Sequence, residues 1–145
     1  MVLGDNWFYG LAENEEGEVI TIQGRDGLEE FIKCGKYPER VEISWKYDGD
    51  ANGMPTEEVS EKMMLMETTL RKAMEKKDKL GILTGVYTGG NEKTWVFYTR
   101  TVRVFGERLN DALKELELFP IAIYTEKDPG WEEYKEMTDT KNEEL

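Results

Sequence analysis

The alternation of apolar and polar positions between residues 40 and 126 predicts two strand–helix–strand units joined by a hairpin. Residues 40–47 alternate strictly, as expected for a strand that is buried on one face. The positions that share the apolar side of this strand are Val41, Ile43, Trp45 and Tyr47. We therefore expect Trp45 to be buried, and Trp95 as well, because it holds the same register in a second strand over residues 94–101.

Turn residues mark the remaining strands of these two units. Residues 80–88 and 94–101 flank the turn Gly89-Gly90-Asn91, which is typical of a β-hairpin. Residues 119–125 form the last strand, and Pro120 favours the start of a strand or an edge position.

Two amphipathic helices connect these strands. Thr56 is a suitable cap for the first helix, because its hydroxyl can accept a bond from a free backbone amide of the first turn. Apolar residues then recur at steps of four and three and form one stripe: Val59, Met63, Met66, Leu70 and Ala73. Lys76-Lys77 suits the negative end of the helix dipole. A second helix spans residues 104–116, with Phe105 and Leu109 on its buried side.

The order of these elements predicts an α+β fold, a two-layer ferredoxin-like (βαββαβ) sandwich with an antiparallel sheet and both helices on one face. An N-terminal hairpin and short helix (5–37) precede the sandwich core (38–127), and an acidic C-terminal tail (128–145) follows it. Within this tail we expect one or two helical turns over residues 131–137. A chain of 145 residues suits a single domain, so we expect one domain over residues 1–145.

Charge is concentrated at the two ends of the chain. The net charge is −12, of which residues 1–35 carry −6 and residues 128–145 carry −5. Nucleic-acid binding rests on Lys and Arg that neutralise phosphates, so this balance argues against it. The acidic ends suit a basic protein partner instead, and we take Glu132, Glu133 and Glu136 as candidate contacts.

The chain has no histidine and one cysteine, Cys34. This composition excludes histidine general bases, serine–histidine triads and zinc clusters of Cys and His within one chain. A lone cysteine cannot form an intramolecular disulfide, and no apolar run approaches the roughly 20 residues of a membrane span. We therefore expect a cytoplasmic protein with no membrane contact and no cofactor; its oligomeric state is left open.

Residues 48–53 reproduce the first half of a calcium-binding loop, with oxygen ligands at alternate positions: Asp48, Asp50 and Asn52. The second half departs from the pattern, because Val59 stands where the bidentate glutamate belongs and Pro55 interrupts the loop. We expect no metal here, with calcium as the alternative.

An aromatic and cationic cluster follows the strand over residues 94–101. If Tyr98 and Arg100 lie on an open sheet face beside Ser44, with Arg103 nearby, they form a platform for a ligand. The alternative is that Trp95 and Phe97 point to the core, while Tyr98 and Arg100 are solvated on the sheet or pack under the N-terminal hairpin. Tyr98, Arg100 and Arg103 are therefore candidate binding residues.

Six segments resemble a bacterial family known as domain of unknown function 695. They are DNWF (5–8), RVEISWKY (40–47), GMP (53–55), LTGVYTG (83–89), WVFYTR (95–100) and PIAIYTEKDP (120–129). The resemblance covers about residues 5 to 137 and implies no activity or catalytic residue. Members of this family also look distantly like the acidic inhibitors of ribonuclease E, which are small αβ sandwiches.

Taken together, these patterns favour a non-enzymatic binding or regulatory protein whose acidic surface meets a basic protein partner such as a nuclease. The alternative is a hydrolase or small-ligand enzyme that works with carboxylates and arginines. A concave pocket distinguishes the two hypotheses, because an enzyme needs one and a protein-binding surface can be flat.

Overall fold

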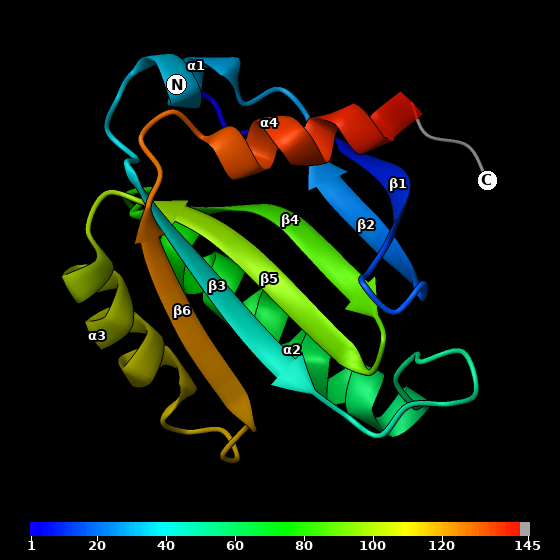
Figure 1. Cartoon of the computed structure of the whole chain (residues 1–145). Helices are drawn as coiled ribbons and strands as arrows, with labels where there is room; N and C mark the ends of the chain where they lie inside the picture. Colours follow the sequence, from blue (N-terminus) through cyan, green and yellow to red (C-terminus); the bar gives the residue numbers. More distant parts are fainter. Residues whose placement is uncertain (143–145) are drawn as a thin grey trace.

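A single antiparallel sheet of six strands, in the order β1-β2-β4-β5-β3-β6, forms the centre of the computed structural model, which describes residues 1–142 (Figure 1). The strands are β1 (Trp7–Glu13), β2 (Val19–Arg25), β3 (Glu39–Lys46), β4 (Gly81–Gly89), β5 (Glu92–Thr99) and β6 (Ile121–Lys127). The helices are α1 (Glu29–Lys33), α2 (Glu57–Glu75), α3 (Val102–Leu113) and α4 (Glu132–Asp139), followed by a 3₁₀ turn, Thr140–Asn142.

Local side-chain bonds set the boundaries of these elements. Asn14 shapes the β1–β2 turn, since its side-chain oxygen accepts from the amides of Glu16 at 3.0 Å and Glu18 at 2.9 Å. Thr56 caps α2, as the sequence predicts, and accepts from the Val59 amide at 3.4 Å. Both side chains thus accept hydrogen bonds from backbone amides at the ends of regular elements.

The larger core lies between the sheet and helices α2 and α3, on the side we term the α2 face. Trp45 and Trp95 are 3% and 1% exposed, which confirms the predicted strand register. Their rings lie 6.3 Å apart, and Phe119 packs 5.0 Å from Trp45. The methionines and leucine of the predicted helical stripe complete this core: Met63, Met66 and Leu70.

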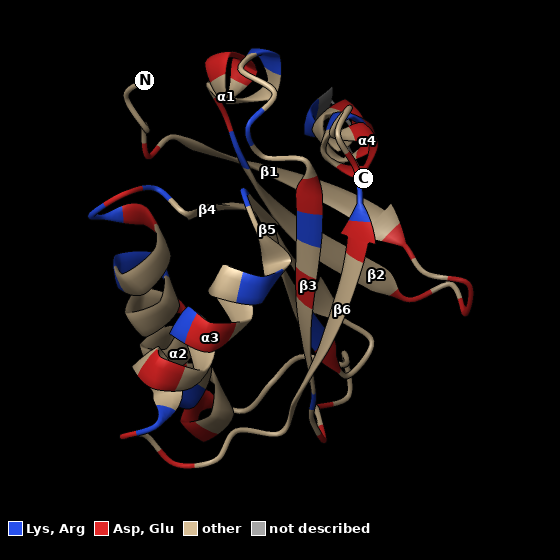
Figure 2. Cartoon of the chain, turned by 90° about the vertical axis from the view of Figure 1, so that its left-hand side faces the viewer, with Lys and Arg blue, Asp and Glu red and all other residues tan. Residues whose placement is uncertain are grey.

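A second core lies on the opposite side of the sheet, which we term the α4 face. Helices α1 and α4 cover one end of this face, and the figures show α4 opposite α2 and α3 across the sheet (Figures 1 and 2). Trp131 is its centre: the indole stacks on Tyr98 with ring centroids 4.2 Å apart and donates to the Tyr37 carbonyl at 2.9 Å. The end of the face away from α4 stays open.

The structure confirms the expected α+β class and antiparallel sheet, but the sheet has six strands and the fold has more than two layers. The hairpin does not merely precede the sandwich, because β2 pairs with β4 and extends the sheet to six strands. Helices lie on both faces, because the helical turns expected in the C-terminal segment form α4, which packs against the sheet and buries Tyr134 and Met137. Glu143 and Glu144, part of the same expected tail, lie outside the described residues. Among residues 1–142, no helix is both long and apolar enough to span a membrane.

Candidate functional site

A hollow of about 270 Å³ opens on the α4 face beside helix α4. We term it the acidic pocket, and its lining residues are Glu42, Tyr87, Thr94, Val96 and Glu133. They come from β3, β4, β5 and α4, so the pocket exists only where three strands and a helix meet.

Strand register brings the sheet residues of the acidic pocket together. Glu42 pairs with Val96 across β3 and β5, and Thr94 pairs with Tyr87 across β5 and β4. Side chains that pair directly across neighbouring strands share one face. The Thr94 hydroxyl also lies 3.3 Å from that of Ser44. The pocket floor therefore combines polar side chains with Val96 near the centre of a sheet whose other face is apolar core.

The guanidinium of Arg40 donates hydrogen bonds to three carboxylates at the rim of the pocket. It donates to Glu42 at 2.8 Å, to Asp128 at 2.8 Å and to Glu126 at 2.5 Å. Arg40 is largely buried, whereas Glu126 is half exposed. With Glu133, four carboxylates stand against this single guanidinium, so the cluster carries an excess of negative charge.

Glu133 is the carboxylate that points into the pocket from α4. It accepts a short hydrogen bond from the Tyr87 hydroxyl, and the Tyr98 hydroxyl lies 3.4 Å away. Burial raises the pKa of Glu133, and the carboxylates of Glu42 and Asp128 add to that effect. A carboxyl group with a raised pKa in a hollow is the kind of group that functional sites contain.

Asp128 shows the opposite behaviour a few ångströms away. Burial raises its pKa, but hydrogen bonds from Tyr98, from the backbone amides of Glu132 and Glu133, and from Arg40 outweigh burial and lower it. The Tyr98 bond is 2.6 Å, and the two amide bonds are 2.9 Å and 3.2 Å. Asp128 therefore stays ionised, caps the first turn of α4 and fixes Glu133 over the pocket.

Tyr98 does not form the open platform considered from the sequence. The structure buries it completely, because Trp131 covers its ring. It still reaches the cluster through its hydroxyl, and burial together with the bond to Asp128 raises its pKa. Neither the platform nor a solvated Tyr98 is therefore correct: the ring is buried, and Trp131 at the start of α4 covers it.

The two predicted arginines lie away from the acidic pocket. Arg100 donates to the carbonyl of Asp78 and lies over the Tyr37 ring, 6.0 Å from its centroid. Arg103 is exposed on α3 and pairs with Glu107 at 3.2 Å. The structure therefore does not bring Arg100 or Arg103 together with Tyr98 in one concave site.

The three predicted glutamates of the C-terminal segment separate by the face of α4 on which they lie. Glu132 and Glu136 are exposed to solvent, whereas Glu133 turns toward the sheet and lines the pocket. Glu132 and Glu136 are four residues apart and therefore share one side of the helix, whereas Glu133 follows Glu132 directly and is rotated away from it. Of the three glutamates, Glu133 is therefore a pocket residue, and Glu132 and Glu136 are surface charges.

The Asp48–Gly53 segment is a hydrogen-bonded turn. The Asp50 carboxylate accepts from the amides of Asn52 at 2.9 Å and Met54 at 3.1 Å, and the Gly53 carbonyl accepts from the Tyr47 hydroxyl at 2.6 Å. In the part of the chain that the structure describes, no group of three or more cysteine, aspartate or glutamate side chains is arranged to hold a metal ion.

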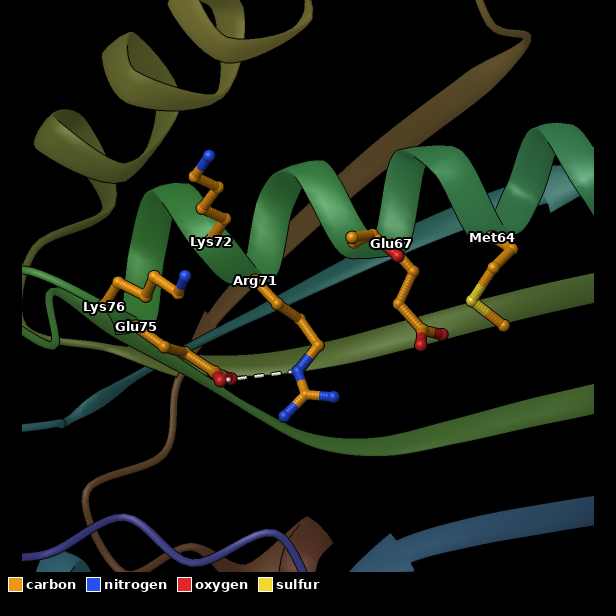
Figure 3. A pocket seen from close by; sticks show the side chains of 7 residues that line it. Met64, Glu67, Arg71, Lys72, Glu75 and Lys76 are labelled. Atoms are coloured by element: carbon orange, nitrogen blue, oxygen red, sulfur yellow. Dashed lines mark hydrogen bonds and ion pairs between the residues drawn. The ribbon is translucent and has the colours of Figure 1, made fainter.

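A second hollow, of about 340 Å³, runs along the outer side of α2 (Figure 3). Figure 3 shows Arg71 and Glu75 pointing toward one another, and their atoms lie 3.3 Å apart. Glu75 also accepts from Arg25 at 2.9 Å, and Arg71 donates to Asp5 at 2.9 Å. Because these charges satisfy one another, this hollow is better explained as the outer side of a structural ion-pair network than as a binding site.

Sequence reasoning missed Glu42, Tyr87 and Thr94 as pocket residues. A signal was present, because Glu42 and Thr94 occupy the polar register of strands whose other side is apolar. That register only indicates a face away from the core. Which polar residues meet there depends on the order of the strands.

The family assignment rests on the whole chain rather than on this pocket. No curated protein and no solved structure matches the sequence. The likeness to ribonuclease E inhibitors is accordingly not shown by any match. Residues 5–137 match the family described as "Family of unknown function (DUF695)", and this range contains every residue of the acidic pocket. As the resemblance of its six segments predicts, the chain belongs to the DUF695 family.

Proposed function

We propose that this protein is a non-enzymatic binding or regulatory protein that holds a basic protein partner on its α4 face, with a Lys or Arg side chain of the partner in the acidic pocket. The observation that carries this proposal is the charge of the pocket. Two carboxylates, those of Glu42 and Glu133, line the pocket, and the guanidinium beside them, that of Arg40, is shared between Glu42 and two further carboxylates outside the lining, Glu126 and Asp128. An added cation would relieve the repulsion between these carboxylates.

The shape and chemistry of the pocket support the same partner. A hollow of about 270 Å³ takes one long side chain, and its lining offers carboxylate oxygens from Glu42 and Glu133 together with the hydroxyl of Thr94. All of these groups can accept from an ammonium or a guanidinium. The exposed acids Glu132 and Glu136 on α4 lie beside the pocket and would attract a basic surface over a longer range.

The test is capture of a partner from the native host followed by kinetics on the purified pair. We expect the Glu42→Gln variant to weaken association at least tenfold. The matched control is the pair Glu15→Gln and Glu16→Gln, which removes more charge from the exposed β1–β2 turn and should leave affinity within about twofold. A partner that binds Glu42→Gln as tightly as the wild type would refute the pocket as its site.

The salt dependence of the association rate distinguishes long-range charge attraction from contacts made in the pocket. Charge steering is screened over about 8 Å at physiological ionic strength. Replacing Glu132 and Glu136 by glutamine should therefore lower the association rate and its salt dependence while changing the dissociation rate little. Glu42→Gln should instead raise the dissociation rate. An association rate indifferent to salt and to both surface acids would contradict the acidic-surface mechanism.

A hydrolase or small-ligand enzyme remains the alternative, and one observation favours it. Glu133, whose pKa is raised by burial, lies beside the Tyr87 hydroxyl in a concave pocket, an arrangement suited to proton transfer. The arginines expected to complete such a site, Arg100 and Arg103, lie elsewhere. Turnover of a hydrolase substrate panel that disappears in Glu133→Gln but survives in Glu132→Gln would support this alternative.

We also propose that β3 to β6 with α2 and α3 form a ferredoxin-like unit to which the N-terminal hairpin and α4 are added. The strand order β4-β5-β3-β6, with every neighbouring pair antiparallel, supports this. A cytoplasmic location stays a prediction from the lone Cys34, which localisation of a tagged protein in the host would test.

A further inference from the structure

Strand β6 forms one edge of the sheet and has one strand partner, β3. Residues 122–127 are exposed along it, and Figure 2 looks onto this edge from outside. An edge strand presents a row of backbone amide and carbonyl groups that can pair with another extended chain. Natural edges are often protected by charge, and in Figure 2 the charged residues of β6 gather at its end, where Glu126 and Lys127 lie.

An apolar groove adjoins β6 on the α2 face. It has a volume of about 510 Å³ and lies between α3 and the edge; its apolar lining residues are Leu109, Leu113, Leu116, Leu118, Phe119, Ile121 and Ile123. Leu118 is 97% exposed and Ile123 is 48% exposed. Such exposed aliphatic side chains at an edge are costly in water unless something covers them.

The other side of β6 has a different chemistry. Tyr124 and Glu126 face the α4 side, where Tyr124 pairs with Glu42 of the acidic pocket and Glu126 pairs with Arg40. Tyr124 is 53% exposed and Glu126 is half exposed. The edge thus divides by face: apolar toward α3, aromatic and acidic toward the pocket.

We infer that β6 binds an extended segment of the basic partner, which adds to the sheet as a seventh strand in which apolar and basic residues alternate. This inference rests on the proposed function for the basic character of the partner. Side chains of paired strands that lie opposite one another share a face. Apolar residues of the added strand enter the groove beside Ile123, while Lys or Arg residues lie over Tyr124 and against Glu126.

Charge decides between this occupant and a second copy of the chain. Each copy carries −12, so two copies repel one another at long range. Antiparallel pairing of two β6 strands about Tyr124 would also place both acidic pockets on one continuous sheet face. A basic segment meets the same edge with opposite charge. The other edge strand, β1, differs from β6 because the Thr140–Asn142 turn packs over it at Gly10, so this part of β1 has no open face.

The experiment uses a synthetic nine-residue peptide in which Val and Lys alternate, titrated into the full chain by calorimetry at physiological salt. The first control peptide has the same composition with its Val and Lys residues in two blocks. Two further peptides carry N-methyl groups on the Val amides alone or on the Lys amides alone. In an added strand alternate amides point toward the sheet, so one methylated peptide should lose binding and the other should keep it.

Protein variants locate the site. Ile123→Lys should weaken binding of the alternating peptide at least tenfold, and Leu65→Lys, an equally exposed apolar residue on α2, should change it less than twofold. Circular dichroism of both variants checks that each is folded. Strand addition would be overturned if the block peptide or both methylated peptides bound the wild-type protein as tightly as the alternating peptide does. It would also be overturned if Ile123→Lys bound the alternating peptide as tightly as the wild type does. A dimer in solution that the peptide does not dissociate would overturn it too, because a second copy would then cover the edge.

The outcomes also separate this inference from the proposed function. If the captured partner depends on Glu42 but ignores Ile123→Lys, the acidic pocket stands as the binding site and strand addition is wrong. If the alternating peptide requires Ile123 while no partner depends on Glu42, β6 is a binding edge and the proposed pocket function is wrong.

Discussion

Replacing Glu75 by glutamine removes the charge that balances the buried guanidinium of Arg25. Arg25 is 2% exposed and Glu75 is 9% exposed, and the two pair at 2.9 Å. Glu75 also accepts from the backbone amide of Leu83 at 2.9 Å, while Arg25 donates to the Leu83 carbonyl at 3.0 Å. The pair therefore links α2, β2 and β4 at one point on the α2 face of the sheet.

The expected loss follows from leaving one buried charge without its partner. Breaking a buried ion pair from one side costs about 3–5 kcal/mol. Glutamine still accepts from Leu83, so the loss is the charge rather than every hydrogen bond. Asp5, 3.5 Å from Arg25, offers partial compensation, but it is two-thirds exposed and solvent screens it. We therefore expect about 3 kcal/mol, or a fall in Tm on the order of 10 °C.

The assay is urea unfolding followed by circular dichroism, with Glu67→Gln as the matched control. Glu67 lies two turns earlier on α2 and accepts from the Trp95 indole at 3.0 Å, a bond that glutamine can also accept. We expect the control to stay within about 0.5 kcal/mol of the wild type. A loss below 1 kcal/mol for Glu75→Gln would refute the reasoning, because Arg25 would then be adequately solvated or paired without it.

Three further predictions concern the tryptophans and the acidic pocket. Trp95→Ala should cost about 3–5 kcal/mol in urea unfolding through the cavity it leaves, and a loss below about 1 kcal/mol would show that the ring is not core. Trp131→Ala should cost a similar amount and release α4, so hydrogen exchange of α4 amides should accelerate more than that of β3; equal acceleration would contradict a local role. The raised pKa of Glu133 means that the folded state holds this proton more tightly, so its contribution to stability is full below the ordinary pKa of 4.5 and is lost as pH rises through the folded pKa. The unfolding free energy of Glu133→Gln relative to wild type should therefore rise with pH over that window. That of Asp128→Asn, whose carboxyl has a lowered pKa, should instead fall as pH rises from the folded pKa of Asp128 to its ordinary pKa of 3.8, and stay constant above it. Urea titrations at several pH values that show neither trend would contradict both assignments.

The strands and helices of this chain are readable from its sequence because each depends on near neighbours. The alternation over β3 predicts which side of that strand is buried, and Trp45 confirms it. The cap at Thr56 and the stripe of α2 likewise lie within a few residues of each other. Helix α4 also has a local signal, since Trp131, Tyr134 and Met137 recur at steps of three. Local periodicity is therefore enough to define the elements, and the matching segments are enough to define the family.

The site depends on contacts between residues that are distant in sequence. Glu42 and Glu133 meet across more than half of the chain, because β3 lies inside the sheet and α4 returns over it. Arg25 and Glu75 meet in the same way, since β2 pairs with β4 rather than remaining a separate hairpin. The sequence by itself determined the elements, their buried faces and the excess of acid. Only the tertiary structure decided which acids share a pocket, because strand order and helix docking are set by the packing of the whole chain.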